Sequence, residues 1–248
     1  MKKISYNDKT FGMREDSLES ARVIAPLIID LINPKSVIDI GCGNGEFLSV
    51  FKKNDIEDIF GVEGEWANKK NLRIPQECFM QTNLEKPLKL DKKFDLVVSL
   101  EVAEHLPESA ARTFVETLTN LGPVVVFSAA IPFQNGVHHI NKQWPSYWAK
   151  LFRERDYVPI DNIRKKIWGN ENVSFWYSQN ILMFVKKEYL KGNKKLQEGF
   201  EQTEESALSM VHPKLYLPKA KRDNVLVRMV PRLIKEDIRK LMNVLKLN

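Results

Sequence analysis

The sequence has few cysteines and no long hydrophobic run. Its 248 residues contain two cysteines, Cys42 and Cys78, whose spacing suggests neither a disulfide framework nor a metal site, so we expect a reducing, cytoplasmic compartment. The first residues lead into no apolar segment of the secretory type. No uncharged apolar run approaches the roughly 18 residues that a membrane span needs. A hydrophobic fraction of 43% with 28% charged residues excludes a disordered or fibrous chain and suits one α/β domain with an appendage.

The excess of positive charge is confined to the C-terminal quarter of the chain. The formal net charge is +6, but residues 186–248 hold 15 Lys and Arg against 8 Asp and Glu, a net of +7. Residues 1–185 therefore hold 23 Lys and Arg against 24 Asp and Glu, a net of −1. A basic balance can attract nucleic acid or an anionic membrane. Because the excess belongs to the tail alone, we expect a small molecule, not nucleic acid, to be the partner of residues 1–185.

The end of the tail has the pattern of a basic amphipathic helix between residues 232 and 247. Such a helix can lie on an anionic bilayer, which would make a peripheral membrane contact. It can also pack on the core or against a second subunit in a homodimer. A packed helix with a solvated basic face is the more ordinary interpretation. The apolar stripe consists of Leu233, Ile234, Ile238, Leu241, Met242 and Leu245.

Apolar runs alternate with helical patterns in a way that predicts a parallel sheet. The near-continuous apolar runs are typical of strands covered on both faces, so we expect an α/β fold. Strands are predicted at 37–40, 59–62, 78–80, 94–100, 124–129 and 180–185. Helices are predicted at 17–31, 46–53, 109–121 and 144–155.

A glycine cluster follows the first predicted strand, with Gly41, Gly43 and Gly45 at alternate positions. Glycines here let the backbone turn sharply and approach a ligand closely. Glu46 follows Gly45, so the pattern fits neither a dinucleotide fingerprint nor a phosphate-binding loop. Asp39, two residues before the first glycine, would repel a pyrophosphate and suits a ligand that carries an ammonium or sulfonium group.

The run Asp39-Ile40-Gly41-Cys42-Gly43-Asn44-Gly45 resembles the D-x-G-x-G-x-G motif of class I S-adenosylmethionine-dependent methyltransferases. The resemblance covers about residues 30–186. It implies a Rossmann-like domain over residues 1–186, with a seven-stranded, mostly parallel sheet, and a basic helical extension over residues 187–248. The alternative is a non-binding glycine turn in another α/β domain.

The same resemblance implies a set of cofactor-binding residues. The glycine loop would wrap the amino-acid end of S-adenosylmethionine, and Glu63, at the end of the second strand, would bind the ribose hydroxyls. Near the adenine, where the family often has Asp, this sequence has Asn83, whose amide offers both a donor and an acceptor. The implied set is Asp39, Gly41, Cys42, Gly43, Gly45, Glu63, Asn83, Leu84 and Leu100.

Titratable side chains follow two neighbouring predicted strands. Glu101, Glu104 and His105 come after the strand at 94–100 at helical spacing, and His138 and His139 follow the strand at 124–129. Ligands in open α/β sheets bind outside the carboxyl ends of the strands, where these residues lie. In one interpretation His139 or His138 is a general base for a substrate hydroxyl, supported by Glu104 and His105. In the other, these side chains bind a divalent metal ion that acidifies the hydroxyl.

The metal interpretation gains support from a second resemblance. The turn Glu101-Val102-Ala103-Glu104-His105 is similar to the E-x-x-E-H turn of small-RNA 2′-O-methyltransferases, in which a later histidine precedes an aromatic-rich helix. This resemblance implies Mn²⁺ or Mg²⁺ at Glu101, Glu104, His105 and His139, and two imidazoles favour Mn²⁺. The loop before His139 is shorter here than in that family. In many other class I methyltransferases the Glu-His pair only packs the loop.

A third resemblance concerns the acceptor. Residues 136–148 and 211–217 are similar to bacterial methyltransferases of surface-polysaccharide biosynthesis, which implies O-methylation of a sugar or of a capsule or lipopolysaccharide precursor. The rivals are an RNA ribose 2′-O-methyltransferase and a binding protein with a vestigial cofactor site. The aromatic side chains Trp144, Tyr147 and Trp148 are spaced for one helix face, and we expect them in the core.

Overall fold

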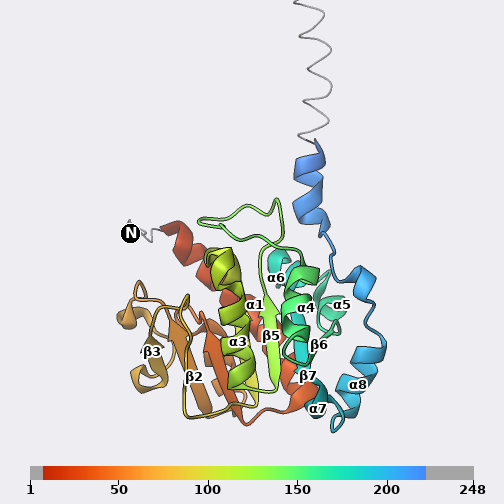
Figure 1. The fold of residues 1–248 in the computed structure, drawn as a ribbon. Coiled ribbons are helices and arrows are strands. Elements are labelled where there is room, and N and C mark those ends of the chain that lie inside the picture. Colours follow the sequence, from red (N-terminus) through yellow and green to blue (C-terminus); the bar gives the residue numbers. More distant parts are fainter. Residues whose placement is uncertain (1–7, 222–248) are drawn as a thin grey trace, which may run out of the picture. The chain divides into compact units, whose positions relative to one another are not determined.

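Seven strands form one sheet in the order β3-β2-β1-β4-β5-β7-β6 in the computed structural model, which describes residues 8–221 (Figure 1). The first five strands of the chain run parallel, and β7 is antiparallel to both β5 and β6. This arrangement confirms the predicted Rossmann-like class I methyltransferase fold. The strands are β1 (Ser36–Ile40), β2 (Asp58–Glu63), β3 (Phe79–Gln81), β4 (Leu96–Leu100), β5 (Val124–Ser128), β6 (Tyr157–Ile160) and β7 (Leu182–Lys186).

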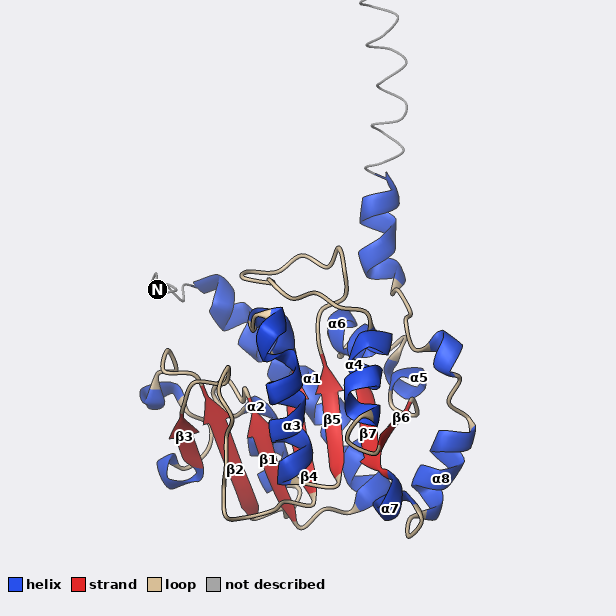
Figure 2. Ribbon diagram, in the orientation of Figure 1, coloured by secondary structure: helices blue, strands red, loops and turns tan. Residues whose placement is uncertain are grey.

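Helices cover both faces of the sheet, and the alternation of strand side chains divides the core between the two faces. Val37 and Leu96 pack with α1 (Asp8–Ile32) and α2 (Glu46–Lys53), whereas Ile38 and Val97 pack with α3 (Ala111–Leu121) and α4 (Pro145–Arg153). Every residue of β1, β4 and β5 is buried, as the apolar runs predict. Figure 2 shows α3 and α4 in front of the sheet.

The strand that the sequence patterns miss is β6. It has four residues and contains Pro159, which cannot donate a ladder hydrogen bond. It lies at the edge of the sheet, where Pro159 is paired in register with Phe184 of β7, so the missing donor costs no interior hydrogen bond. The other six strands lie where the apolar runs predict them, within about two residues.

Helical segments after β7 continue the first of two compact units, which extends to Met210. These segments are α7 (Lys187–Leu190) and α8 (Lys194–Glu201), and Leu196 of α8 is fully buried against the core. Gly199 allows α8 to approach β6, because a Cβ atom there would lie 2.9 Å from Ile160 Cγ2. The predicted division into a domain over residues 1–186 and an extension over residues 187–248 stays a prediction.

The second unit comprises residues 211–248, of which the structure describes a helix at 213–221. The amide N–H of Lys214 donates to His212 Nδ1 over 3.1 Å at its start. The helix expected at 232–247 lies outside the described residues. Within residues 8–221, no helix has the length and apolar character needed to cross a membrane.

Candidate active site

The glycine loop after β1 has the backbone conformation that its motif requires. Gly41, Gly43 and Gly45 have φ angles of 87°, 61° and 86°, a region that side-chain-bearing residues rarely adopt. The amide N–H groups of Gly41 and Cys42 both donate to the carbonyl of Val62, over 2.7 and 3.1 Å, so the loop is tied to β2. Burial raises the pKa of the Cys42 thiol, which keeps it protonated and unreactive.

Three buried carboxylates surround this loop. Glu63 Oε2 accepts a 2.8 Å hydrogen bond from Gly43 N, and Glu46 Oε2 accepts one of 3.0 Å from Asn44 N. Burial, together with the charges of Glu63 and Glu46, raises the pKa of Asp39 well above its usual range. Arg73 approaches from one side, with its Nε 3.8 Å from Glu46 Oε1. A cluster of buried carboxylates favours a ligand that brings positive charge.

The residues predicted to bind adenine lie next to the end of β2. The amide N–H of Thr82 donates to the carbonyl of Glu63 over 2.9 Å, which places the segment that follows it beside the glycine loop. In that segment Asn83 is half-buried and Leu84 is buried. Asn83 Oδ1 accepts a hydrogen bond from Glu85 N, so its amide NH₂ remains available to a ligand. Leu100, the last residue of β4, is also buried.

The end of β4 packs directly on the glycine loop. A Cβ atom on Gly41 would lie 2.3 Å from Val102 Cγ2, so only glycine fits there. Val102 precedes the short 3₁₀ helix η3 (Ala103–His105), which carries Glu104 and His105. The predicted cofactor residues and the predicted reaction residues are therefore neighbours.

Glu104, His105 and His139 form one cluster, in which their potential ligand atoms all lie within 4.8 Å of one another. His139 Nε2 is 3.9 Å from Glu104 Oε1, and the rings of His105 and His139 meet edge to face at 4.9 Å. The carbonyl of Glu104 accepts hydrogen bonds from Ile140 N and Asn141 N, of 2.9 and 3.0 Å, and these hold the histidine segment in place. His138 has a positive φ of 57° and is exposed, so it lies outside the cluster.

The electrostatics of this cluster are unusual. Glu104 is fully buried, and within residues 15–221 neither of its carboxylate oxygens has a hydrogen-bond partner, nor does His139 Nδ1. Burial and the neighbouring charge of Glu101 raise the pKa of Glu104 well above its usual range. Burial, with the positive charges of His105 and Lys142, lowers the pKa of His139 to about 4. His139 is therefore a neutral imidazole at physiological pH.

Glu101 has a different environment from the other three predicted metal ligands. Its φ of 56° is unusual for a residue with a side chain. Gln134 Nε2 donates to Glu101 Oε2 over 3.1 Å, and Asn180 Nδ2 donates to Oε1 over 3.0 Å. Gln134 Oε1 in turn accepts from Asn180 Nδ2 and from Gln179 Nε2. Sequence reasoning missed these three buried amides, because amide side chains carry no motif or titration signal.

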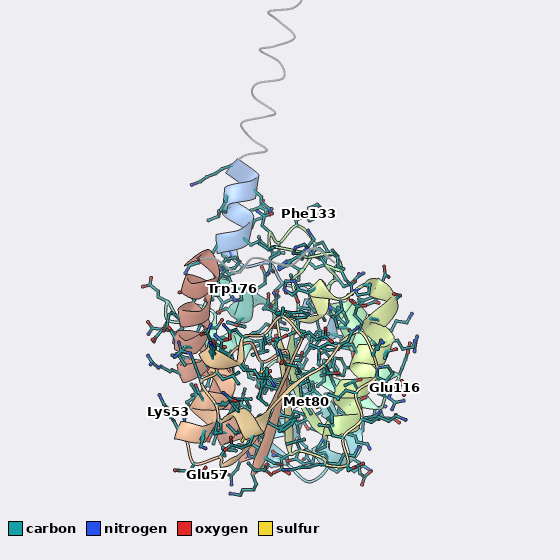
Figure 3. The ribbon with its side chains drawn as sticks, turned by 90° about the vertical axis from the view of Figure 1, so that its left-hand side faces the viewer. Lys53, Glu57, Met80, Glu116, Phe133 and Trp176 are labelled. Carbon is teal, nitrogen blue, oxygen red and sulfur yellow. The ribbon has the colours of Figure 1, made fainter. Side chains whose placement is uncertain are left out.

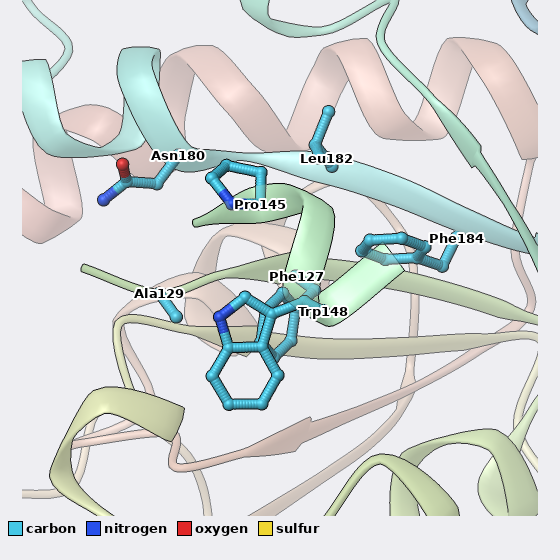
Figure 4. Close-up of a pocket in the computed structure, with 7 residues that line it drawn as sticks. All are labelled: Phe127, Ala129, Pro145, Trp148, Asn180, Leu182 and Phe184. Atoms are coloured by element: carbon cyan, nitrogen blue, oxygen red, sulfur yellow. The ribbon is translucent and has the colours of Figure 1, made fainter. Parts of the chain in front are cut away.

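A small cavity of about 10 Å³ lies beside this amide network (Figure 4). Trp148 lines it and is buried, as predicted for the core, but within residues 15–221 its Nε1 has no hydrogen-bond partner. Trp144 is exposed, so the prediction that all three aromatic side chains belong to the core is wrong for this residue. Trp144 lies just before the first residue of α4, so its side chain is not part of the buried face of that helix. The cavity lining is Phe127, Ala129, Pro145, Trp148, Asn180, Leu182 and Phe184.

The strand order, the glycine loop after β1 and the carboxylate at the end of β2 define a class I methyltransferase fold. The chain belongs to the methyltransferase domain family, which matches residues 15–166. No curated protein matches the sequence.

Solved structures of the same fold come from several bacteria. Streptomyces venezuelae DesVI is 15% identical, with a TM-score of 0.55, over 74% of this chain and 100% of its own. CalS10 of Micromonospora echinaspora, an amino pentose methyltransferase, is 12% identical, with a TM-score of 0.54, over 75% and 100%. Magnesium protoporphyrin IX methyltransferase of Synechocystis PCC 6803, solved with bound SAH, is 18% identical, with a TM-score of 0.53, over 74% and 90%. At these identities the likeness shows the fold alone.

Proposed function

We propose that this chain transfers the methyl group of S-adenosylmethionine to an oxygen of a small polar acceptor, in the class of sugars and glycan precursors. The main observation in support is that the predicted cofactor site and the predicted acceptor site pack directly against each other. The acidic glycine loop lies against the Glu104–His105–His139 cluster through the contact between Gly41 and Val102. A positively charged methyl donor suits the first site, and an acceptor hydroxyl suits the second.

The cofactor site fits S-adenosylmethionine on chemical grounds. Its ammonium and sulfonium groups would offset the acidic character of the site formed by Asp39, Glu63 and Glu46. The two oxygens of Glu63 accept backbone hydrogen bonds from Gly43 and Gly64, and in this proposal the carboxylate also accepts one from a ribose hydroxyl. In this proposal the amide of Asn83 hydrogen-bonds the adenine edge.

S-adenosylmethionine supplies an electrophilic methyl group on sulfur when it is bound. His139 would accept the proton of the acceptor hydroxyl as that oxygen attacks the methyl group. Glu104, whose Oε1 lies 3.9 Å from His139 Nε2, would stabilise the resulting imidazolium. His105 holds the ring of His139 by its edge-to-face contact.

The preference for a sugar-like acceptor rests on three supports of different kinds. Residues 1–185 have a net charge of −1, which disfavours a polyanionic substrate such as RNA. Residues 136–148 are similar to methyltransferases of surface-polysaccharide biosynthesis. CalS10, which shares the fold, is an amino pentose methyltransferase.

A second candidate is a metal-dependent methyltransferase that acts on the ribose 2′-oxygen of RNA. The observation in its favour is the donor set of Glu104, His105 and His139, in which two carboxylate oxygens and one imidazole nitrogen lack partners within residues 15–221. A carboxylate with two neutral imidazoles fits Mn²⁺ better than Mg²⁺, and such an ion would lower the pKa of the acceptor hydroxyl. Glu101 fits this set less well, because both of its oxygens already bind amides.

The test begins with calorimetric titration of the purified chain with S-adenosylmethionine. Radiolabelled methyl transfer is then measured with activated sugars, phosphorylated glycan precursors and RNA, each with and without exhaustive chelation. We expect cofactor binding and chelator-resistant transfer to a sugar-class acceptor. Transfer to RNA that chelation abolishes would establish the second candidate instead. Cofactor binding without transfer to any acceptor would indicate a binding protein.

A further inference from the structure

The loop between β5 and α4, residues 131–144, has the opposite of the usual burial pattern. Its polar side chains Gln134 and Asn141 are buried, while Phe133, Val137 and Ile140 are 74%, 69% and 64% exposed. Trp144, at its end, is 38% exposed. Isolated exposed apolar residues are ordinary, but this loop holds four of the nine large hydrophobic side chains that are exposed in the described part of the chain. We name residues 131–144 the inverted loop.

The inverted loop projects beyond the carboxyl ends of the strands, where the candidate acceptor site lies (Figure 1). Figure 3 shows Phe133 at the end of the molecule opposite Glu57 and Lys53. The buried polar residues hold the loop in this arrangement, because Gln134 donates to Glu101 and Asn141 N donates to the carbonyl of Glu104. The apolar side chains are therefore presented outward by a loop whose inner face is fixed by hydrogen bonds.

The residues that flank the loop in the sequence carry charge of one sign. From residue 117 to residue 153 the sequence contains no Asp or Glu, whereas it contains Lys142, Lys150 and Arg153. Arg153 is paired with Glu205, but Lys142 and Lys150 form no ion pair within residues 15–221. An acid-free segment with exposed Phe, Ile, Val and Trp beside lysines has the composition of a protein surface that enters the interface of an anionic bilayer.

We propose that the inverted loop docks on an anionic phospholipid surface and that the acceptor is a glycan precursor carried by a membrane lipid. The statement about the acceptor rests on the function proposed above; the statement about the surface does not. His139 lies on the same loop, with its ring against Gly136, where an added Cβ would lie 2.0 Å from Nε2. Docking would therefore present the acceptor site to polar head groups at the membrane. The basic residues 186–248, with 15 Lys and Arg against 8 Asp and Glu, add a second attraction to anionic lipid.

The experiment measures sedimentation of the full chain with two kinds of vesicle. One kind contains phosphatidylcholine alone, and the other contains phosphatidylcholine with a substantial fraction of anionic phosphatidylglycerol. The variants are Phe133→Ser/Ile140→Ser in the loop and Phe200→Ser as the matched control, since Phe200 is 40% exposed on α8. We expect the wild-type chain and the control to bind the anionic vesicles. The loop variant should bind roughly tenfold more weakly, because two interfacial side chains are lost. Lys142→Glu should also weaken binding, most strongly at low salt.

Cofactor titration and circular dichroism of each variant show that folding is intact, and they separate this proposal from the proposed function. Vesicle binding requires neither cofactor nor acceptor, so it can succeed or fail independently of methyl transfer. Equal vesicle binding by the wild type and the loop variant overturns the proposal, as does an absence of binding to anionic vesicles. A wild-type dimer that the loop substitutions convert to a monomer, without vesicle binding, would identify the loop as a contact between two copies instead.

Discussion

Glu63 accepts a hydrogen bond of 2.8 Å from the backbone N–H of Gly43, twenty residues earlier in the chain. Its second oxygen accepts one from Gly64 N, also over 2.8 Å. The carboxylate that we assign to the ribose hydroxyls is thus already aligned by two backbone donors, and it holds the glycine loop in place. A single side chain at the end of β2 both shapes the cofactor loop and is part of the proposed ligand site.

Substitution of Glu63 by alanine should weaken cofactor binding strongly. Hydrogen bonds to charged groups contribute about 1.5–3 kcal/mol each, so the Kd for S-adenosylmethionine should rise roughly 10- to 100-fold. Calorimetric titration measures the change. Glu65→Ala is the matched control, because Glu65 is exposed two residues further on and should leave the Kd unchanged. Equal affinities of the Glu63 variant and the wild type would remove Glu63 from the ligand site.

Substitution of Gly41 by alanine should destabilise the fold for two separable reasons. The added methyl would lie 2.3 Å from Val102 Cγ2, and φ is 87°. We expect a loss of about 2–4 kcal/mol in the free energy of unfolding, measured by urea denaturation. Gly41→Ala/Val102→Ala should be less destabilised than the sum of its single substitutions, because the steric clash is gone while the strain in φ remains. Gly169→Ala is the control, since no atom lies within 4 Å of a Cβ there, and it should have little effect.

Asp39 should make the stability of the ligand-free protein depend on pH. Burial and two neighbouring carboxylates raise its pKa in the folded state well above the ordinary value of an aspartate. The folded state therefore binds the proton more tightly than the unfolded state, and stability falls as pH rises from about 4 through the raised pKa. Asp39→Asn removes this loss, so the variant should be more stable than the wild type at pH 8 and similar to it near pH 4. Urea denaturation across this range tests the prediction.

The same Asp39→Asn substitution should weaken binding of S-adenosylmethionine, because a charge that offsets the ligand is lost. A variant that is more stable without ligand yet binds it less well would show that the acidic loop is maintained for the ligand. A variant with lower stability at pH 8 and unchanged affinity would contradict both the assigned pKa direction and the role of Asp39.

His139 should control turnover without affecting cofactor affinity. Loss of a general base lowers rates typically by about 10²–10⁴-fold, so His139→Ala should reduce kcat by that range while the Kd for S-adenosylmethionine stays constant. His138→Ala is the matched control, since its side chain lies outside the cluster, and it should retain most activity. Elemental analysis of the active protein accompanies the assay. A bound divalent ion, with activity lost on chelation, would assign His139 as a metal ligand.

Sequence patterns predict the conformation of the glycine loop better than the arrangement of the acceptor half. The glycine loop and Asp39 follow from local signals, because strand, turn and charge occur within short segments, whereas the role of Glu63 rests on the resemblance to class I methyltransferases. The proximity of His105 and His139 follows from the rule that ligands bind where parallel strands end. The amide network around Glu101 could not be predicted, since Gln134 and Asn180 come from distant segments and resemble ordinary polar residues. The strand β6 was also missed, because its four residues carry no clear alternation.

The carbonyl of Glu104 accepts hydrogen bonds from both Ile140 and Asn141. One peptide group therefore joins the end of β4 to the segment that carries His139, and the carboxylate and the imidazole are aligned by main-chain atoms. Residues 132–138 form a span that begins and ends at fixed points. The exposed side chains in this span, such as Phe133 and Val137, take no part in that alignment, so they can be replaced while the geometry between Glu104 and His139 is preserved.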